Sequence, residues 1–296
     1  MNIENKLKEI LTLNNNTNVK IMELLTYINN NNLEIQSLST STDNNFNILD
    51  LVKSNLWPTA VNENLIIDRN NEEEKQERAQ GIIELFLEES LENKKFLDYG
   101  CSEGHVVEAA SKISTYAVGY DIKSFSKWNE INCTSDWNKI VENGPYDVVL
   151  MFDVLDHLIN ENPVDVLKKI KSITNQNGSV YIRFHPITSR CATHSYHKLN
   201  KAFVHLVLNH DQLIQLLPNE EDYIANNGSS KPIKSYEEYI RESGFVIESR
   251  NEITEKPEDF FKNPNISKII QNKTGFNEFP EFQMSLNFVD YKLINK

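Results

Sequence analysis

Two carboxylates and two glycines in the middle of the chain have the types and spacing to hold a nucleotide-like ligand. Asp98 and Gly100 end an apolar run, and Gly104 follows shortly after. Glycine permits a tight turn and lets a ligand approach the backbone, and a helix that starts after the turn offers free N–H groups. Asp121 lies 23 residues after Asp98, where a carboxylate can accept both hydroxyls of a ribose. The spacing predicts a binding site for a cofactor that contains a ribose.

The pattern from Arg78 onward indicates which elements must position these residues. Apolar runs alternate with amphipathic stretches, as in parallel strands that carry helices on both faces of the sheet. The expected strands are residues 95–99, 116–121, 146–152, 179–185, 245–251 and 283–292. The expected helices are residues 74–91, 105–111, 163–172 and 235–243. Only irregular chain is expected between the last two strands, and the final strand can return antiparallel as a hairpin.

The first 77 residues differ in composition from the rest and are predicted to form a helical extension. They contain eighteen asparagines and only scattered apolar side chains. Residues 3–13 and 19–28 space their apolar side chains as amphipathic helices do. Two interpretations stay open: a packed decoration from a genome of biased composition, or a surface that docks a protein partner. We divide the chain into this extension, 1–77, and a main domain, 78–296.

Charge and cysteine content exclude several classes of protein. The 43 acidic and 30 basic side chains leave a net charge of -13, which disfavours indiscriminate binding to nucleic acid or anionic lipid. The three cysteines form no CxxC pair, so neither a disulfide framework nor a zinc knuckle is indicated. No apolar run approaches the ~20 residues of a membrane helix, and the N-terminus shows no signal-peptide pattern. We expect a cytoplasmic protein without a membrane partner.

Four sequence blocks carry a resemblance to a known family. They are residues 98–104 (DYGCSEG), 119–121 (GYD), 146–157 (YDVVLMFDVLDH) and 238–245 (EYIRESGF). Together they resemble the class I S-adenosylmethionine-dependent methyltransferases over roughly residues 78–296. The resemblance implies a Rossmann-like α/β fold with a seven-stranded, mostly parallel sheet, and S-adenosylmethionine as the cofactor. A nicotinamide-binding fold is the alternative, but its GxGxxG spacing is absent.

The resemblance also implies which residues hold the cofactor. Those around its methionine part would be Asp98, Gly100, Cys101 and Gly104. Asp121 would hold the ribose, and Asp136 and Trp137 fall where the family commonly contacts adenine. Phe152 and Asp153 would line the pocket near the transferred methyl group. Ser102 stands where the family often has glycine, and its small side chain is expected to leave binding intact.

An acidic and histidine-containing cluster after the fourth strand is the predicted catalytic group. His157 is the first candidate for a base, since imidazole titrates near neutral pH, and a structural bond to the backbone is the alternative. Asp153 would act beside it. Asp153, Asp156 and His157 form a DxxDH pattern where two metal-using groups of the family have ExxEH, so bound magnesium or manganese is possible but not favoured.

A basic stretch interrupts the acidic chain between Val166 and His210. It holds seven lysines and arginines, no acidic residue and five of the seven histidines. Part of it belongs to a predicted lid-like insertion at about 186–232. Arginine makes planar paired contacts to phosphate and carboxylate, so an anionic acceptor is predicted to bind here. The proposed acceptor-binding residues are Arg183, His185, Arg190, His194 and Lys201. Neutralisation of the acidic remainder is the alternative.

Together these features predict an S-adenosylmethionine-dependent methyltransferase. Its acceptor is expected to be an oxygen or nitrogen of a small or nucleotide-like anionic molecule. Two other functions stay open. One is an RNA methyltransferase of the 2′-O type that uses the basic stretch 166–210, whose binding would weaken steeply with salt. The other is a non-catalytic assembly protein that acts through residues 1–77, because members of one fold can lose activity.

Overall fold

A seven-stranded sheet forms the centre of the computed structural model, which describes residues 47–61, 71–192, 196–217, 230–255, 259–276 and 282–296. The helices expected at 3–13 and 19–28 lie outside the described residues. The strands are β1 Lys95–Tyr99, β2 Tyr116–Tyr120, β3 Cys133–Thr134, β4 Tyr146–Phe152, β5 Thr174–Phe184, β6 Val246–Thr254 and β7 Leu286–Ile294. Their order in the sheet is β3-β2-β1-β4-β5-β7-β6. All neighbours pair in parallel except β7, which is antiparallel to β5 and β6.

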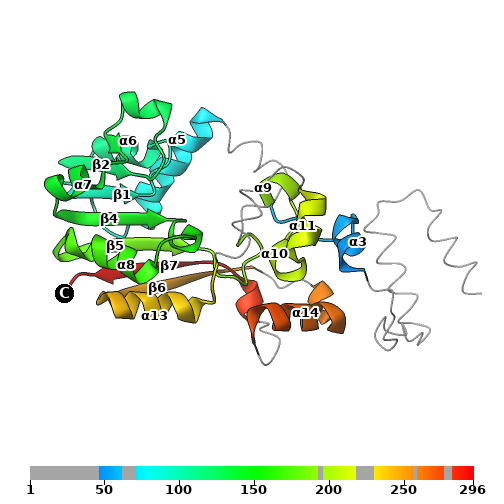
Figure 1. The fold of residues 1–296 in the computed structure, drawn as a ribbon. Coiled ribbons are helices and arrows are strands. Elements are labelled where there is room, and N and C mark those ends of the chain that lie inside the picture. Colours follow the sequence, from blue (N-terminus) through cyan, green and yellow to red (C-terminus); the bar gives the residue numbers. More distant parts are fainter. Residues whose placement is uncertain (1–46, 62–70, 193–195, 218–229, 256–258, 277–281) are drawn as a thin grey trace, which may run out of the picture.

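Helices lie on both faces of the sheet (Figure 1). The main helices are α5 Glu72–Gly81, α6 His105–Ser111, α7 Trp137–Asn143, α8 Pro163–Ser172 and α13 Ile233–Ser243. Side chains of α7, α8 and α13 pack on one face, whereas α5 and α6 pack on the other. Adjacent strand residues point to opposite faces, so Leu97 joins the first core and Phe96 the second. No described helix is long and apolar enough to cross a membrane.

A small helical lobe stands beside the sheet with a core of its own (Figure 1). It contains α3 Ile48–Lys53, α10 Val204–Val207, α11 His210–Leu216 and α14 Pro264–Thr274, and α9 Tyr196–Leu199 lies next to them. Trp57 anchors the N-terminal segment, because its indole N–H donates to the backbone oxygen of Ala202 at 2.7 Å. The lobe therefore combines three segments that are far apart in the sequence. The expectation of irregular chain between β6 and β7 is wrong, since α14 lies there.

A π-helical turn follows α5 and replaces the end of the single helix expected at 74–91. It spans η1 Ile82–Phe86 and closes with a hydrogen bond from the N–H of Leu87 to the oxygen of Ile82, five residues earlier. The wider turn directs Leu85 and Phe86 toward the sheet. Such turns often occur at functional sites because they change the direction of side chains within a helix.

Candidate active site

A turn with left-handed residues connects β1 to α6. Gly100 and Gly104 have φ values of +89° and +91°, and Ser102 between them has a φ of 47°. A Cβ atom on Gly100 would overlap the side chain of Val154, and one on Gly104 would lie 2.9 Å from the Cys133 sulfur. Both the backbone conformation and the lack of space thus require glycine at these two positions. The result is a backbone surface that a ligand can approach closely.

The carboxylate of Asp121 lies directly against this turn. One oxygen accepts the backbone N–H of Ser102 at 3.0 Å, and the other accepts that of Lys123 at 3.1 Å. The N–H of Gly100 in turn donates to the oxygen of Tyr120 at 2.7 Å. The end of β2 therefore fixes both the turn and the carboxylate next to it.

Asp98 is a buried carboxyl group below the turn. Its side chain is 4% exposed, and burial followed by the nearby charge of Asp121 raises its pKa to about 7. At neutral pH this group is close to the midpoint of its titration. A ligand that brings a positive charge near Asp98 would favour the ionised form.

A cavity of about 300 Å³ separates the turn from α5, and we call it the turn cavity. Its lining includes Asp98, Gly100, Cys101 and Phe152 on the sheet side and Arg78 and Ile82 on the helical side. Of the residues predicted to hold the cofactor, these first four border the cavity. Gly104 and Asp121 stand beside it in the turn and at the end of β2.

The two residues predicted to contact adenine have structural partners of their own. Asp136 is the N-cap of α7, where its side chain accepts the N–H of Asn138 at 3.0 Å. The Trp137 ring packs edge-to-face against Tyr99 and Tyr120, at centroid distances of 6.1 and 5.2 Å. Neither residue borders the turn cavity. Their predicted role in adenine binding stays a prediction.

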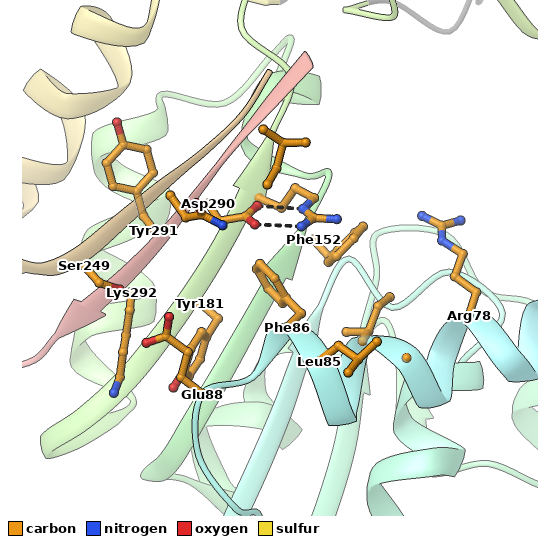
Figure 2. A pocket seen from close by; sticks show the side chains of 15 residues that line it. Arg78, Leu85, Phe86, Glu88, Phe152, Tyr181, Ser249, Asp290, Tyr291 and Lys292 are labelled. Carbon is orange, nitrogen blue, oxygen red and sulfur yellow. Dashed lines mark hydrogen bonds and ion pairs between the residues drawn. The ribbon is translucent and has the colours of Figure 1, made fainter. Parts of the chain in front are cut away.

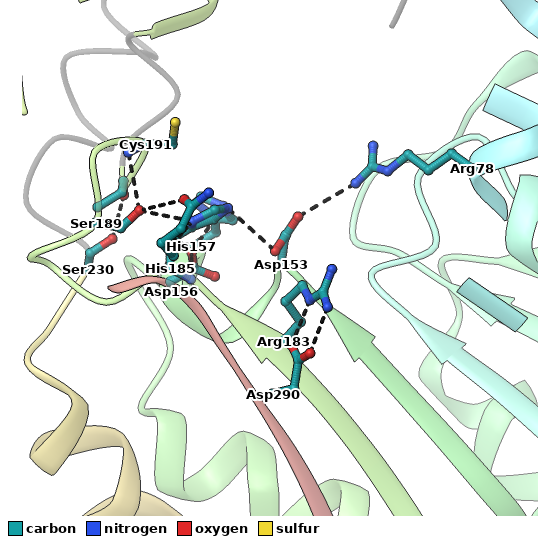
Figure 3. Close-up of polar contacts among 12 residues, drawn as sticks. Arg78, Asp153, Asp156, His157, Arg183, His185, Ser189, Cys191, Ser230 and Asp290 are labelled. Carbon is teal, nitrogen blue, oxygen red and sulfur yellow. Dashed lines mark hydrogen bonds and ion pairs between the residues drawn. The ribbon is translucent and has the colours of Figure 1, made fainter. Parts of the chain in front are cut away.

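The acidic and histidine-containing cluster lies where β4 and β5 end (Figure 3). Asp156, fully buried, accepts the backbone N–H of His185 at 3.1 Å, and its carboxylate is 3.7 Å from Nε2 of His157. His185 donates from Nδ1 to the backbone oxygen of Asn287 at 2.7 Å. Its Nε2 then faces Asp153 at 4.0 Å. The sheet thus brings together residues that are about 30 positions apart in the sequence.

Burial controls the charge of this cluster. It raises the pKa of Asp156 to about 7, and the neighbouring charge of Asp153 acts in the same direction. It lowers the pKa of His157, which keeps this imidazole neutral and able to accept a proton at neutral pH. Asp153 has a φ of 55°, an uncommon backbone conformation for a residue other than glycine. One oxygen of Asp153 and one of Asp156 are buried without a hydrogen-bond partner.

Asp153, Asp156 and His157 are also the possible metal ligands that the sequence indicates. Among the described residues, the group of three ligand atoms that lie within 4.8 Å of one another is Glu72, Glu103 and His105, at the mouth of the turn cavity. That group is already bonded to lysines, since Lys127 pairs with Glu72 and Lys75 pairs with Glu103 at 2.7 Å. The structure gives no argument for a metal there.

A second cavity of about 530 Å³ lies on the sheet surface between η1 and the outer strands β6 and β7, and we call it the sheet groove (Figure 2). Phe86 and Leu85 form its helical wall, and Asn251 of β6 lies on the opposite wall. Arg78 and Phe152 border both the sheet groove and the turn cavity. The two cavities therefore meet beside the acidic and histidine-containing cluster.

Arg183, predicted to bind an anionic acceptor, lies in the sheet groove but has an internal partner. Its guanidinium donates two hydrogen bonds to Asp290, at 2.6 and 2.7 Å (Figure 3). It also lies 4.8 Å from the ring centres of Phe86 and Phe152 and 3.8 Å from that of Phe288. Its charge is thus neutralised and its faces are covered by aromatic rings.

The other basic residues predicted to bind the acceptor do not converge on either cavity. Arg190 donates to Glu255 at 2.7 Å, and Lys201 donates to the backbone oxygen of Ser54 at 2.8 Å. The contact of Arg190 with Glu255 fits the alternative that the basic stretch neutralises acidic parts of its own chain. His194 lies outside the described residues.

Sequence reasoning did not identify Arg78 and Phe86 as part of the site. Arg78 lies 3.6 Å from Asp153, and its side chain is 54% exposed. Phe86 packs edge-to-face on Phe152 at 5.3 Å. The sequence contains no motif that indicates either contact, because both depend on how the helix before β1 lies across β4 and β5.

The strand order, the glycine turn after β1 and the carboxylate after β2 define the class I methyltransferase fold. Residues 71–249 match the sequence profile of a family described as a methyltransferase domain, and the chain belongs to that family. This family match identifies the protein as an S-adenosylmethionine-dependent methyltransferase. The predicted class, fold and cofactor are thereby confirmed.

Several solved structures are similar to this chain. One is an S-adenosylmethionine-dependent methyltransferase from Archaeoglobus fulgidus, with 16% identity, a TM-score of 0.44, and coverage of 74% of this chain and 94% of that one. Another, from Listeria monocytogenes, has 14% identity, a TM-score of 0.44 and coverage of 74% and 99%. A third is phosphoethanolamine N-methyltransferase 2 from Haemonchus contortus in complex with S-adenosyl-L-methionine, with 13% identity, a TM-score of 0.43 and coverage of 73% and 52%. No curated protein matches the sequence.

Proposed function

We propose that the protein methylates an oxygen or nitrogen of a small anionic acceptor, which meets the cofactor where the turn cavity joins the sheet groove. The observation that carries this proposal is the position of Arg78 and Phe152, which border both cavities. Asp153 stands within 3.6 Å of Arg78 at this junction. An acceptor placed there has a cation for its negative charge and a proton acceptor close by.

The turn cavity fits the methionine end of the cofactor. Gly100 lines this cavity with backbone alone, and the carboxyl group of Asp98 on the same lining suits an ammonium group. Asp121, already fixed to the turn through Ser102, has the place and charge to accept ribose hydroxyls. When bound, S-adenosylmethionine supplies an activated methyl group on a sulfonium sulfur.

The chain's own residues would position the acceptor and take its proton. His157 is kept neutral by burial, and Asp153 stands between Arg78 and His185. A neutral imidazole or a carboxylate at this point can accept the proton that leaves the acceptor oxygen or nitrogen. His185 holds its Nδ1 proton on Asn287, which leaves Nε2 facing the same space. Correct alignment would contribute the rest of the rate enhancement.

Both arginines among the seven basic residues on which the RNA alternative rests have acidic partners. Arg183 and Arg190 form ion pairs with Asp290 and Glu255, so these two arginines are not available as a free phosphate-binding row. Methylation of a small acceptor is therefore the function that the site supports best.

Calorimetric titration with S-adenosylhomocysteine tests the cofactor site. We expect micromolar binding by the wild-type protein and at least about tenfold weaker binding by Asp121→Ala, a loss of about 1.4 kcal/mol. Asp165→Ala is the matched control, because it removes an exposed carboxylate in the first turn of α8, far from both cavities. Absence of binding by folded wild-type protein, or equal weakening in the two variants, would contradict the proposal.

A further inference from the structure

The sheet groove has the size and continuity of a ligand site. Its volume of about 530 Å³ falls within the ~300–1,000 Å³ typical of small-molecule pockets. It opens beside Phe152 at the end of β4, the same residue that borders the turn cavity. A molecule in the groove would therefore reach the place where we put the transferred methyl group.

The floor and helical wall of the groove are aromatic. Phe86 and Phe152 meet edge-to-face at 5.3 Å with an interplanar angle of 79°, and Phe86 and Tyr181 do so at 6.1 Å. The guanidinium of Arg183 lies among these rings, held by Asp290 and unable to form a second paired contact with a ligand. The rings thus form a corner in which a planar ring system can stack on one ring and meet the edge of another.

The helical wall of the groove carries one exposed apolar side chain and an open position. Leu85, which the π-helical turn directs toward the groove, is 87% exposed. Gly81, one turn earlier, also lines the groove, and a Cβ atom there would meet nothing within 4 Å. The helical wall thus combines an apolar contact with open space, an arrangement that leaves room for a ligand.

Charge distinguishes the two ends of the groove. Arg78, at the end shared with the turn cavity, has Asp153 as its ion-pair partner among the described residues, at 3.6 Å. Its guanidinium is 5.5 Å from the ring centre of Phe152, so it lies over the aromatic surface. At the other end, Lys292 is paired with Glu248 at 2.8 Å. Arg78 is thus the more accessible of the two cations, since its side chain is 54% exposed and its ion pair is long, whereas the Lys292 side chain is 17% exposed.

We propose that the sheet groove is the acceptor site and that it takes a planar aromatic acid, held in the corner between the rings of Phe86 and Phe152 with its carboxylate on Arg78. This inference rests on the proposed function, since it names the class of acceptor for the same site. The hydroxyl or amine to be methylated would be carried by the ring. A flat acid of two fused rings would use the aromatic surface more fully than a single ring.

A fluorescent probe of this class tests the proposal. The probe is 6-hydroxy-2-naphthoate, titrated into protein saturated with S-adenosylhomocysteine. Gly81→Trp fills the groove from its helical wall, where the structure has open space, and Asn251→Trp fills it from the exposed face of β6. Gln80→Trp is the control, because Gln80 is exposed on the same helix and borders neither cavity.

We expect the wild-type protein and Gln80→Trp to bind the naphthoate alike, and both blocking variants to bind it at least about tenfold more weakly. Two blocking variants on opposite walls keep the test valid if one of them does not fold. All folded variants should bind S-adenosylhomocysteine as the wild-type protein does. Absence of naphthoate binding by the wild-type protein, or equal binding by all variants, would overturn the inference while the cofactor titration still supports the proposed function. If the wild-type protein does not bind S-adenosylhomocysteine, that result would instead contradict the proposed function itself.

Discussion

The two cavities are built in different ways, although they share a border. The turn cavity is formed mainly by a continuous segment, residues 98–106, with α5 and Phe152 on its other side. The sheet groove takes its walls from η1, β5, β6 and β7, and its central ion pair joins residues 107 positions apart. The comparison teaches that a backbone turn can hold a site through local geometry, whereas a groove on a sheet depends on strand register.

This difference predicts that the turn cavity is the more sensitive to a single methyl group. Gly100→Ala adds a Cβ atom that overlaps Val154 in a left-handed residue. We expect the free energy of unfolding to fall by at least about 3 kcal/mol, or the binding of S-adenosylhomocysteine to weaken about a hundredfold, because strain and overpacking act together. Thermal unfolding and calorimetry measure the two effects. Gly81→Ala is the control, since its helical backbone and open surroundings predict equal or higher stability. Similar behaviour of the two variants would remove the distinction.

In the sheet groove, the largest loss should come from breaking its ion pair. Asp290→Ala leaves the Arg183 guanidinium, 20% exposed, without its carboxylate. We expect the free energy of unfolding to fall by about 3 kcal/mol in urea titrations. The double variant with Arg183→Met should recover part of this loss, because the unpaired charge is gone. If the double variant loses as much free energy of unfolding as the two single variants together, the pairing does not contribute to stability.

Two carboxyl groups are buried, one beside the turn cavity and one in the acidic and histidine-containing cluster, and the pKa of each is raised to about 7. They are Asp98 below the turn and Asp156 behind His185. Unfolded, each would titrate near 3.8, so the folded protein binds more protons between about pH 4 and pH 7. Its free energy of unfolding should therefore fall as pH rises through this range.

The corresponding variants are Asp98→Asn and Asp156→Asn, measured without ligand. Between pH 5 and pH 8 the free energy of unfolding of each variant should fall by about 1–2 kcal/mol less than that of the wild-type protein. Burial lowers the pKa of His157 and His205, which acts in the opposite direction, but these residues are common to all three proteins and cancel in the difference. A pH dependence unchanged in both variants would contradict the assignment.

The smallest effect is expected at the surface contacts that connect α5 to the turn. Lys127 pairs with Glu72, and Lys75 pairs with Glu103, across the mouth of the turn cavity. Both pairs are partly exposed, so Lys127→Ala should lower the melting temperature by only about 1–3 °C at low salt. The difference from the wild-type protein should disappear near 1 M salt, where screening acts within about 3 Å. A difference that persists there would indicate a packing role for the lysine stem.

Much of the fold follows from local patterns. The strand runs at 95–99 and 146–152 coincide with β1 and β4, and Gly244 ends α13 in a left-handed cap as expected. The helix α14 is an error of the sequence analysis that local signals could have prevented. Asn263 caps its start, Pro264 is its first residue, and Gly275 ends it in a left-handed cap. Its apolar residues Ile266 and Ile270 are buried in the core of the helical lobe.

The sequence by itself determined the alternation of strands and helices, the glycine turn and the carboxylate after β2. These features depend on local backbone preference and on a spacing of a few residues, which a linear pattern records. Only the tertiary structure decided that Arg183 pairs with Asp290, that Arg190 pairs with Glu255, and that Arg78 stands where the two cavities meet. The physical reason is that an ion pair or a cavity wall depends on strand register and helix placement, which bring together residues far apart in the chain.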